Sequence, residues 1–270
     1  MQTSRFILCL SVVIAMLSIV TQSAVADDIA YMETGFNQFG TIDLTTGVFT
    51  KIATTTTRVG GLGYAIGQFY GWQDNGNQVL GVNPATGVES GIGNHTLPST
   101  VGNLASAANG LVAMDEFTGN LLSINPNTGV ATLIGPTGLA NYYGIGNGLG
   151  NNIYVGLGGA DTLLYSVNTT TGAATLLGDT GVAFAGAFVW VNGTLYAGSN
   201  LSGQFAIYKL NPTTYQGTFV ADLTGTSNGD FWGLGIIGGS APVVPEPSSL
   251  ALFGAGLIPV LNRLRRYLSR

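Results

Sequence analysis

One short phrase recurs five times along the chain, and it constrains the fold more than any other sequence feature. Its turn glycines are spaced 40, 42 and 43 residues apart, and the fifth copy follows 43 residues later with Tyr215 in the glycine's place. A period of this length is typical of architectures in which each repeat is one supersecondary unit. The copies, which start at Ile42, Val82, Ile124, Val167 and Leu210, read IDLTTGVFTKIA, VNPATGVESGIG, INPNTGVATLIG, VNTTTGAATLLG and LNPTTYQGTFVA.

Each copy of the phrase has the local chemistry of a β-hairpin. An apolar strand ends in Asn or Asp, whose side chain can cap the turn, and in three copies a proline (Pro84, Pro126, Pro212) fixes the next φ angle. The Thr-Gly that follows closes the turn, because glycine takes a positive φ at no steric cost. A second apolar strand then completes the hairpin.

Two more short strands are predicted upstream of each hairpin. In the fourth repeat they are 143–146 and 152–156, and in the fifth they are 185–191 and 194–197. Four strands in about 42 residues match the blade of a β-propeller. The predicted fold class is therefore all-β, and the pattern resembles, in a general way, propeller repeats of exported bacterial proteins.

The two ends of the array predict how the ring closes. The first repeat opens directly with Ile29 to Thr34 and lacks an innermost strand, whereas Phe231 to Ile237 is left over after the fifth hairpin. This last segment resembles the innermost-strand segment Val59 to Gly63 of the second repeat. Joining the two ends gives five four-stranded blades. The alternatives are an open β array and a six-bladed ring, for which the 40–43 residue spacing leaves no room.

Charge and cysteine content exclude several classes of function. Between Asp27 and Val244 there are twelve acidic residues and only Lys51, Arg58 and Lys209 as basic ones, which gives a net charge of 3 − 12 = −9. Such a domain repels phosphate backbones, so no nucleic-acid partner is expected. Cys9 is the only cysteine and lies in the N-terminal segment. The exported domain is therefore expected to have no disulfide, thiolate metal site or cysteine nucleophile.

The N-terminus has the three parts of a secretory signal. Arg5 supplies the positive charge, Phe6 to Val20 is almost wholly apolar, and Ala24-Val25-Ala26 is a small-x-small cleavage site. Residues 1–26 are therefore predicted to be a signal peptide that signal peptidase removes after Ala26. A retained membrane anchor is the alternative.

The C-terminus has three ordered features. They are Pro245-Glu246-Pro247, the apolar run Leu250 to Leu261, and the basic cluster Arg263, Arg265 and Arg266. In this order they resemble the PEP-CTERM family of sorting tails. The resemblance implies processing by an exosortase, with a temporary stage in the inner membrane of a Gram-negative bacterium and final display at the cell surface or release outside.

The physics of the tail agrees with this resemblance, with one departure. The two prolines keep the motif extended and accessible, and the arginines favour the cytoplasmic side. The apolar run has only twelve residues and contains Pro259; as a helix it would span about 18 Å, against about 30 Å of hydrocarbon. An amphipathic tail is the alternative. The predicted domains are thus 1–26, the propeller 27–239, a linker 240–244 and the tail 245–270.

No motif in the sequence carries catalysis, and we expect neither enzymatic activity nor a cofactor or metal. His95 is the only histidine and lies in a turn-like segment. A glycosidase or lyase would need converging carboxylates. The available ones are more typical of solvated turn caps, and they are Asp74, Asp115, Glu116, Asp161 and Asp230.

Aromatic residues near blade starts and ends are the better indication of binding, because sugars stack on aromatic faces. Blade-to-blade packing is the competing explanation for most of them. The set comprises Trp72, Tyr142, Tyr143, Trp190, Phe231 and Trp232. At these blade starts and ends, we predict ligand contacts at Trp72, Asp74, Trp190 and Trp232. The expected function is a structural or binding module in exopolysaccharide or biofilm, with a multivalent lectin or a polysaccharide-processing enzyme as alternatives.

Overall fold

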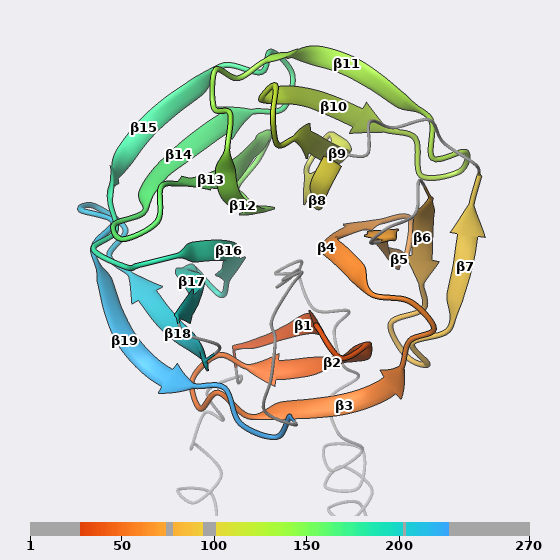
Figure 1. Ribbon diagram of the computed structural model, residues 1–270, viewed down its shortest axis with the longest axis horizontal. Coiled ribbons are helices and arrows are strands. Elements are labelled where there is room, and N and C mark those ends of the chain that lie inside the picture. Colours follow the sequence, from red (N-terminus) through yellow and green to blue (C-terminus); the bar gives the residue numbers. More distant parts are fainter. Residues whose placement is uncertain (1–27, 74–77, 94–100, 202–203, 227–270) are drawn as a thin grey trace, which may run out of the picture.

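A computed structural model describes residues 28–73, 78–93, 101–201 and 204–226, which form five antiparallel sheets around a central axis (Figure 1). Blade 1 has β1 (Ile29–Thr34), β2 (Gln38–Asp43) and β3 (Phe49–Thr54); blade 2 has β4 (Val59–Ala65), β5 (Gln68–Gln73), β6 (Val79–Val82) and β7 (Glu89–Ile92). Blade 3 has β8 (Val101–Ala107), β9 (Gly110–Asp115), β10 (Asn120–Ile124) and β11 (Ala131–Pro136). Blade 4 has β12 (Tyr142–Asn147), β13 (Asn152–Leu157), β14 (Leu163–Asn168) and β15 (Ala174–Asp179); blade 5 has β16 (Ala185–Val191), β17 (Thr194–Leu201), β18 (Gln204–Leu210) and β19 (Gly217–Asp222).

The predicted five-bladed all-β propeller is confirmed by this arrangement. Among the described residues blade 1 has three strands, as its sequence predicts, and each of the other blades has four. The proposed closing strand, Phe231 to Ile237, lies outside the described residues, as do the predicted signal peptide and C-terminal helix. In the described part of the chain, no helix is long and apolar enough to cross a membrane.

The repeated phrase folds as predicted because its turn chemistry is local. In the second copy Asn83 Oδ1 accepts hydrogen bonds from the backbone N–H groups of Ala85 (2.9 Å) and Thr86 (3.1 Å). Asn125, Asn168 and Asn211 cap their turns in the same way. The four turn glycines have φ between 65° and 78°. Tyr215 adopts φ 60° at the same position, which is the strained region for a residue with a side chain.

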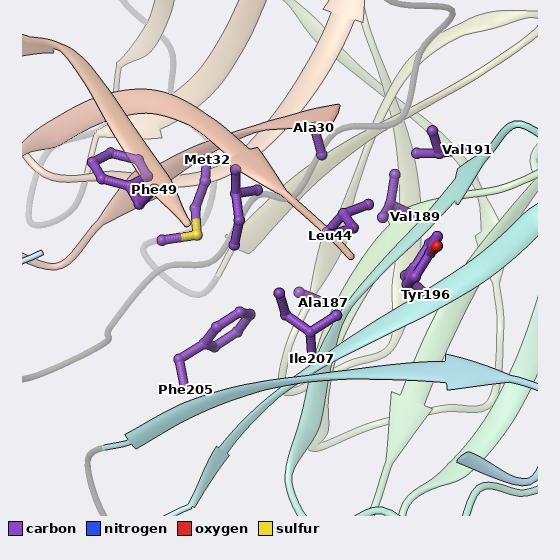
Figure 2. Close-up of a cluster of buried hydrophobic side chains, with 11 residues drawn as sticks. Ala30, Met32, Leu44, Phe49, Ala187, Val189, Val191, Tyr196, Phe205 and Ile207 are labelled. Atoms are coloured by element: carbon purple, nitrogen blue, oxygen red, sulfur yellow. The ribbon is translucent and has the colours of Figure 1, made fainter. Parts of the chain in front are cut away.

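Apolar side chains fill the space between neighbouring blades, with one cluster for each of the five interfaces. Figure 2 shows the cluster between blades 1 and 5, where Met32 and Leu44 face Val189 and Ile207. Because this cluster joins the first and last described blades, burial of apolar surface closes the ring.

Backbone contacts close the ring at the same interface. The Thr224 N–H donates to the Gly47 carbonyl (2.8 Å), and the Phe49 N–H donates to the Thr224 carbonyl (2.9 Å). The end of β19 thus reaches the hairpin turn of blade 1, and a Cβ on Gly47 would collide with the Asp222 carbonyl. Gly87 lies against the end of β3 and Gly172 against the end of β11 in the same manner. Blade 5 therefore joins blade 1 as other blades join their neighbours.

The loops divide between two faces of the ring. The connector face carries the connectors between blades and the turns between second and third strands; for example, the Asn141 N–H donates to the Glu116 carbonyl (2.7 Å). The turn face carries the turns between first and second strands, such as Asn192-Gly193. Asp28 Oδ1 accepts a hydrogen bond from Asn192 Nδ2 (2.8 Å), so the described chain begins at the turn face.

Candidate functional site

Two aromatic rings from neighbouring blades meet on the connector face. Tyr143, at the start of β12, and Phe184, in the connector before β16, have ring centroids 5.3 Å apart and ring planes inclined by 56°. Tyr143 is 41% exposed and Phe184 is half-buried. We call this pair the aromatic platform. It offers a partly exposed apolar surface with a hydroxyl group at one edge.

A β-bulge presents the Tyr143 ring. The register between β12 and β13 shifts between Tyr142 and Gly144, so Tyr143 is the extra residue. Bulges of this kind re-aim a side chain. The first strands of blades 2, 3 and 5 have the same shift, but there the extra residue is glycine: Gly61, Gly102 and Gly186. Among the described blades, the platform is therefore a feature of the junction between blades 4 and 5 alone.

Two glycines make room for the platform. A Cβ on Gly186 would lie 2.8 Å from Cδ1 of Tyr143, and one on Gly159 would lie 3.2 Å from Cε1 of Phe184. Phe184 itself has φ 51°, a conformation that costs an ordinary residue about 1 kcal/mol or more. Its backbone is held by a hydrogen bond from its N–H to the Gly159 carbonyl (2.7 Å). Backbone strain of this kind is concentrated at functional sites.

The surroundings of the platform are polar but not strongly charged. Partial burial raises the pKa of the Tyr143 phenol, so its hydroxyl is neutral and can both donate and accept hydrogen bonds at physiological pH. Asn141, which directly precedes β12, and Asp161, in the loop between β13 and β14, are both exposed. The Asn200 N–H donates to the Phe184 carbonyl (3.4 Å), which places another amide residue nearby. Aromatic faces with amide and hydroxyl neighbours suit a neutral, hydroxylated ligand.

A second cluster, around the connector 55–58, is buried and structural. Glu33 Oε1 accepts hydrogen bonds from Thr55 Oγ1 (2.8 Å) and from the Val59 N–H (3.2 Å). Oε2 has no hydrogen-bond partner among the described residues. Burial is the main cause that raises the pKa of Glu33 from 4.5 to about 8, and the nearby Glu89 carboxylate raises it further, against the lowering effect of the Thr55 hydrogen bond. With no exposed surface, Glu33 is not placed to act on a substrate.

Two of the predicted ligand contacts lie among the described residues. Trp72 is only 5% exposed and packs with Leu104 and Ile124 between blades 2 and 3. Its use as a stacking surface would require that packing to open. Trp190 is half-buried and packs against the cluster between blades 4 and 5, near the turn face. Asp74 and Trp232 lie outside the described residues.

Of the carboxylates considered for catalysis, Asp74 and Asp230 lie outside the described residues. Within the described part of the chain, no group of three or more His, Cys, Asp or Glu side chains could hold a metal ion. Asp115 instead caps a turn, because its Oδ1 accepts hydrogen bonds from the N–H groups of Phe117 (3.0 Å) and Thr118 (2.8 Å). Ala24, Ala26, Pro245, Glu246, Pro247 and the three arginines lie outside the described residues.

Sequence reasoning noted Tyr143 as one of several aromatics but did not select it, and it missed Phe184. A signal for Tyr143 was present, since it stands where the corresponding strands of other repeats have glycine. That correspondence depends on bulge positions, which require the strand register. Phe184 has no comparable signal, because its left-handed backbone is visible only in three dimensions.

Comparison with known proteins supports the fold and the tail. Residues 243–266 match the family described as the PEP-CTERM protein-sorting motif. A solved structure described as "Crystal structure of Nidogen/Laminin Complex" contains a chain similar to this one, with a TM-score of 0.53 and 9% sequence identity over 77% of this chain and 97% of that chain. At this identity the likeness concerns the fold alone. Among curated proteins, none matches this chain.

The predicted sorting tail is therefore confirmed as a sequence motif. The chain carries a PEP-CTERM sorting motif at residues 243–266, downstream of a five-bladed propeller. Such a motif implies export and processing by an exosortase.

Proposed function

We propose that this exported protein is a non-enzymatic binding module, and that its propeller holds a neutral polysaccharide of the extracellular matrix or cell surface. The observation that carries the proposal is the aromatic platform of Tyr143 and Phe184. A partly exposed ring pair, flanked by amides and held by a strained backbone, fits the apolar face of a sugar ring.

Charge and location support the same ligand class. The propeller segment has few basic residues and a net negative charge, which disfavours anionic ligands and leaves hydroxyl and amide groups for recognition. A PEP-CTERM tail directs the domain to a compartment where polysaccharide is abundant. Because the bulges of blades 2, 3 and 5 hold glycine, we propose one such stacking site among the described blades rather than one per blade.

Binding can be tested with the exported protein purified from its host. Affinity electrophoresis through the host's own exopolysaccharide, and through a neutral glucan, would measure retardation of the wild type and of Tyr143→Ala. The expected loss is about tenfold or more in affinity, because truncating an aromatic anchor costs about 2 kcal/mol. Phe184→Gly should weaken binding while relieving the backbone strain, so it separates lost affinity from lost stability.

Phe219→Ala is the matched control, because Phe219 is an exposed aromatic on an outer strand, away from the platform. It should retain wild-type retardation. Equal retardation of wild type and Tyr143→Ala in a gel that retards the wild type would refute the platform as the binding site. Release of reducing ends or unsaturated sugars from the polysaccharide would refute the non-enzymatic part of the proposal.

The sorting part of the proposal needs its own test. Replacing Pro245, Glu246 and Pro247 with alanine should leave full-length protein in the inner membrane, because the processing enzyme loses its extended recognition segment. Fractionation of the host with an antibody to the propeller measures this. Arrival of the triple variant at the surface, shortened as in the wild type, would refute the assignment.

A further inference from the structure

Exposed aromatic side chains are unevenly distributed over the described part of the ring. They are Phe36, Phe117, Tyr143 and Phe219. Phe219 lies on the outer strand β19, whereas the other three lie on the connector face. The large apolar side chains that are exposed in turns of the turn face, Ile66 and Leu149, are aliphatic. Rings that a ligand can reach are therefore concentrated on the face that carries the aromatic platform.

Phe117 is an exposed ring on a fixed backbone. It lies in the turn between β9 and β10 and is 63% exposed. Asp115 holds this turn, because its Oδ1 accepts hydrogen bonds from the N–H groups of Phe117 and Thr118. The Gly119 N–H also donates to the Asp115 carbonyl (2.9 Å). Because the turn is already ordered, a ligand that contacts the ring loses little affinity to the ordering of the backbone.

The connector that leads to the platform is hydrogen-bonded to the same turn. The Thr137 N–H and Oγ1 both donate to the Gly119 carbonyl, at 2.9 Å and 2.7 Å. The Asn141 N–H donates to the Glu116 carbonyl (2.7 Å). Two residues after Asn141 the chain reaches Tyr143 at the start of β12. The turn of blade 3 and the platform of blade 4, which are neighbouring blades in Figure 1, thus belong to one continuous surface.

The separation of Phe117 and Tyr143 is limited by this hydrogen bond. Phe117 directly follows Glu116, and Tyr143 is two residues from Asn141. Because consecutive Cα atoms are about 3.8 Å apart, the Cα atoms of Phe117 and Tyr143 are separated by at most about 18 Å. Glu116 and Asn141, which connect the two positions, are both exposed.

We propose that Phe117 is a second stacking subsite, so that one neutral polysaccharide chain contacts Phe117 and the aromatic platform at the same time. This inference rests on the proposed function. A polysaccharide offers many equivalent rings, and two linked contacts hold one chain more tightly than either contact alone. The Glu116 carboxylate and the Asn141 amide supply hydrogen-bonding groups for sugar hydroxyls. The charge of Glu116 also favours a neutral chain over an anionic one.

Phe36 is the comparable residue without this link. It lies in the turn between β1 and β2, where its N–H donates to Thr34 Oγ1 (3.3 Å), and it is 41% exposed. The Thr55 N–H donates to the Asn37 carbonyl of that turn (2.8 Å), so the connector that contacts it is the one leading to blade 2. Phe36 therefore lies at the junction of blades 1 and 2, whereas Phe117 lies at that of blades 3 and 4.

Dependence on ligand length tests the second subsite. Affinity electrophoresis measures binding to the intact host exopolysaccharide, and calorimetry measures binding to its fragments that are too short to reach both rings. Phe117→Ala should lose about three- to tenfold in affinity for the intact chain and keep the wild-type affinity for the fragments. Tyr143→Ala should lose affinity for both ligands. Phe36→Ala is the matched control and should bind both ligands as the wild type does.

Phe117→Tyr keeps an aromatic ring and should retain wild-type binding to the intact chain. Since the Phe117 side chain is mostly exposed, Phe117→Ala should unfold at the wild-type urea concentration.

The outcomes separate this inference from the proposed function. If Phe117→Ala binds the intact chain like the wild type while Tyr143→Ala does not, the second subsite is wrong and the proposed function stands. Equal losses in Phe117→Ala and Phe36→Ala, or equal losses of Phe117→Ala on fragments and intact chain, would also overturn the second subsite. If the wild type is not retarded, or Tyr143→Ala binds as the wild type does, the proposed function fails and this inference fails with it.

Discussion

Blades 1 and 2 place very different side chains at the same point of their second strands. Glu33 lies opposite Phe39, and Trp72 lies opposite Val79. Phe39 and Val79 each stand three residues before the first residue of the repeated phrase in their blade. Blade 3 has Met114 at this point, opposite Leu121. All three side chains are buried between blades.

The difference shows that the same blade backbone can be stabilised against its neighbour either by apolar packing or by a buried hydrogen-bonded carboxyl group. Trp72 fills its interface with apolar surface and makes its contribution at any pH. Glu33 instead holds the connector between blades 1 and 2 by accepting hydrogen bonds from Thr55 and Val59. Its carboxyl group is buried, and Oε2 has no hydrogen-bond partner among the described residues. A buried acid makes that interface sensitive to pH.

The largest effect that distinguishes the two interfaces is the pH dependence caused by Glu33. Its pKa is about 8 in the folded protein and 4.5 in the unfolded chain. The folded state therefore holds a proton that unfolding releases between these values, and stability falls as pH rises from 4.5 to 8 and is level above. The full loss is as much as roughly 5 kcal/mol.

Urea unfolding of wild type and Glu33→Gln at pH 5 and pH 8 measures this difference. The amide keeps the volume without the charge, so the variant should lose most of the pH dependence and be the more stable protein at pH 8. A wild-type stability that is equal at the two pH values would contradict the buried, protonated carboxyl.

Truncating the blade 2 counterpart should give a slightly smaller effect with no pH dependence. Trp72→Ala should cost about 3–5 kcal/mol, because it leaves a large cavity between blades 2 and 3. The same urea unfolding at pH 5 and pH 8 should give equal losses. The half-buried Trp190 provides the control, and Trp190→Ala should cost less. A loss below about 1 kcal/mol for Trp72→Ala would show that the interface is not tightly packed.

The smallest effect concerns the connector threonines. Thr55 Oγ1 donates to the Glu33 carboxyl (2.8 Å), whereas Thr180 Oγ1 donates to the Thr162 carbonyl (2.8 Å). Thr180→Val should cost about 1 kcal/mol at any pH. Thr55→Val should cost more, about 2 kcal/mol, and the cost should grow above pH 8, where the carboxylate is charged. Equal and pH-independent costs from chemical denaturation would show that Thr55 does not stabilise the ionised carboxyl.

Sequence reasoning succeeded where structure is local and failed where it depends on packing. The hairpins were predictable because Asn83 and its counterparts cap turns within three residues of themselves. The number of blades followed from their spacing. The burial of Glu33 was not predictable, because it depends on a connector 22 residues away. The packing of Trp72 between blades was not predictable either, since an aromatic side chain has the same sequence signature in a core and in a binding site, and its role as a ligand contact stays a prediction.

The overlap of each outer strand with the next hairpin has an evolutionary consequence. Gly47 contacts the end of β19, and Gly87 contacts the end of β3 in the same way. A blade joined in this manner receives the outer strand of one neighbour at its hairpin turn and extends its own outer strand to the hairpin turn of the other. Losing or duplicating a single blade would change the angle that each blade has to span for the ring to close. A change in copy number would therefore strain all the interfaces between blades, whereas a change in a surface loop leaves those interfaces intact. A descendant of this ring would more readily acquire a new ligand through changes in the loops and bulges of one face, such as the bulge that holds Tyr143, than by adding a repeat.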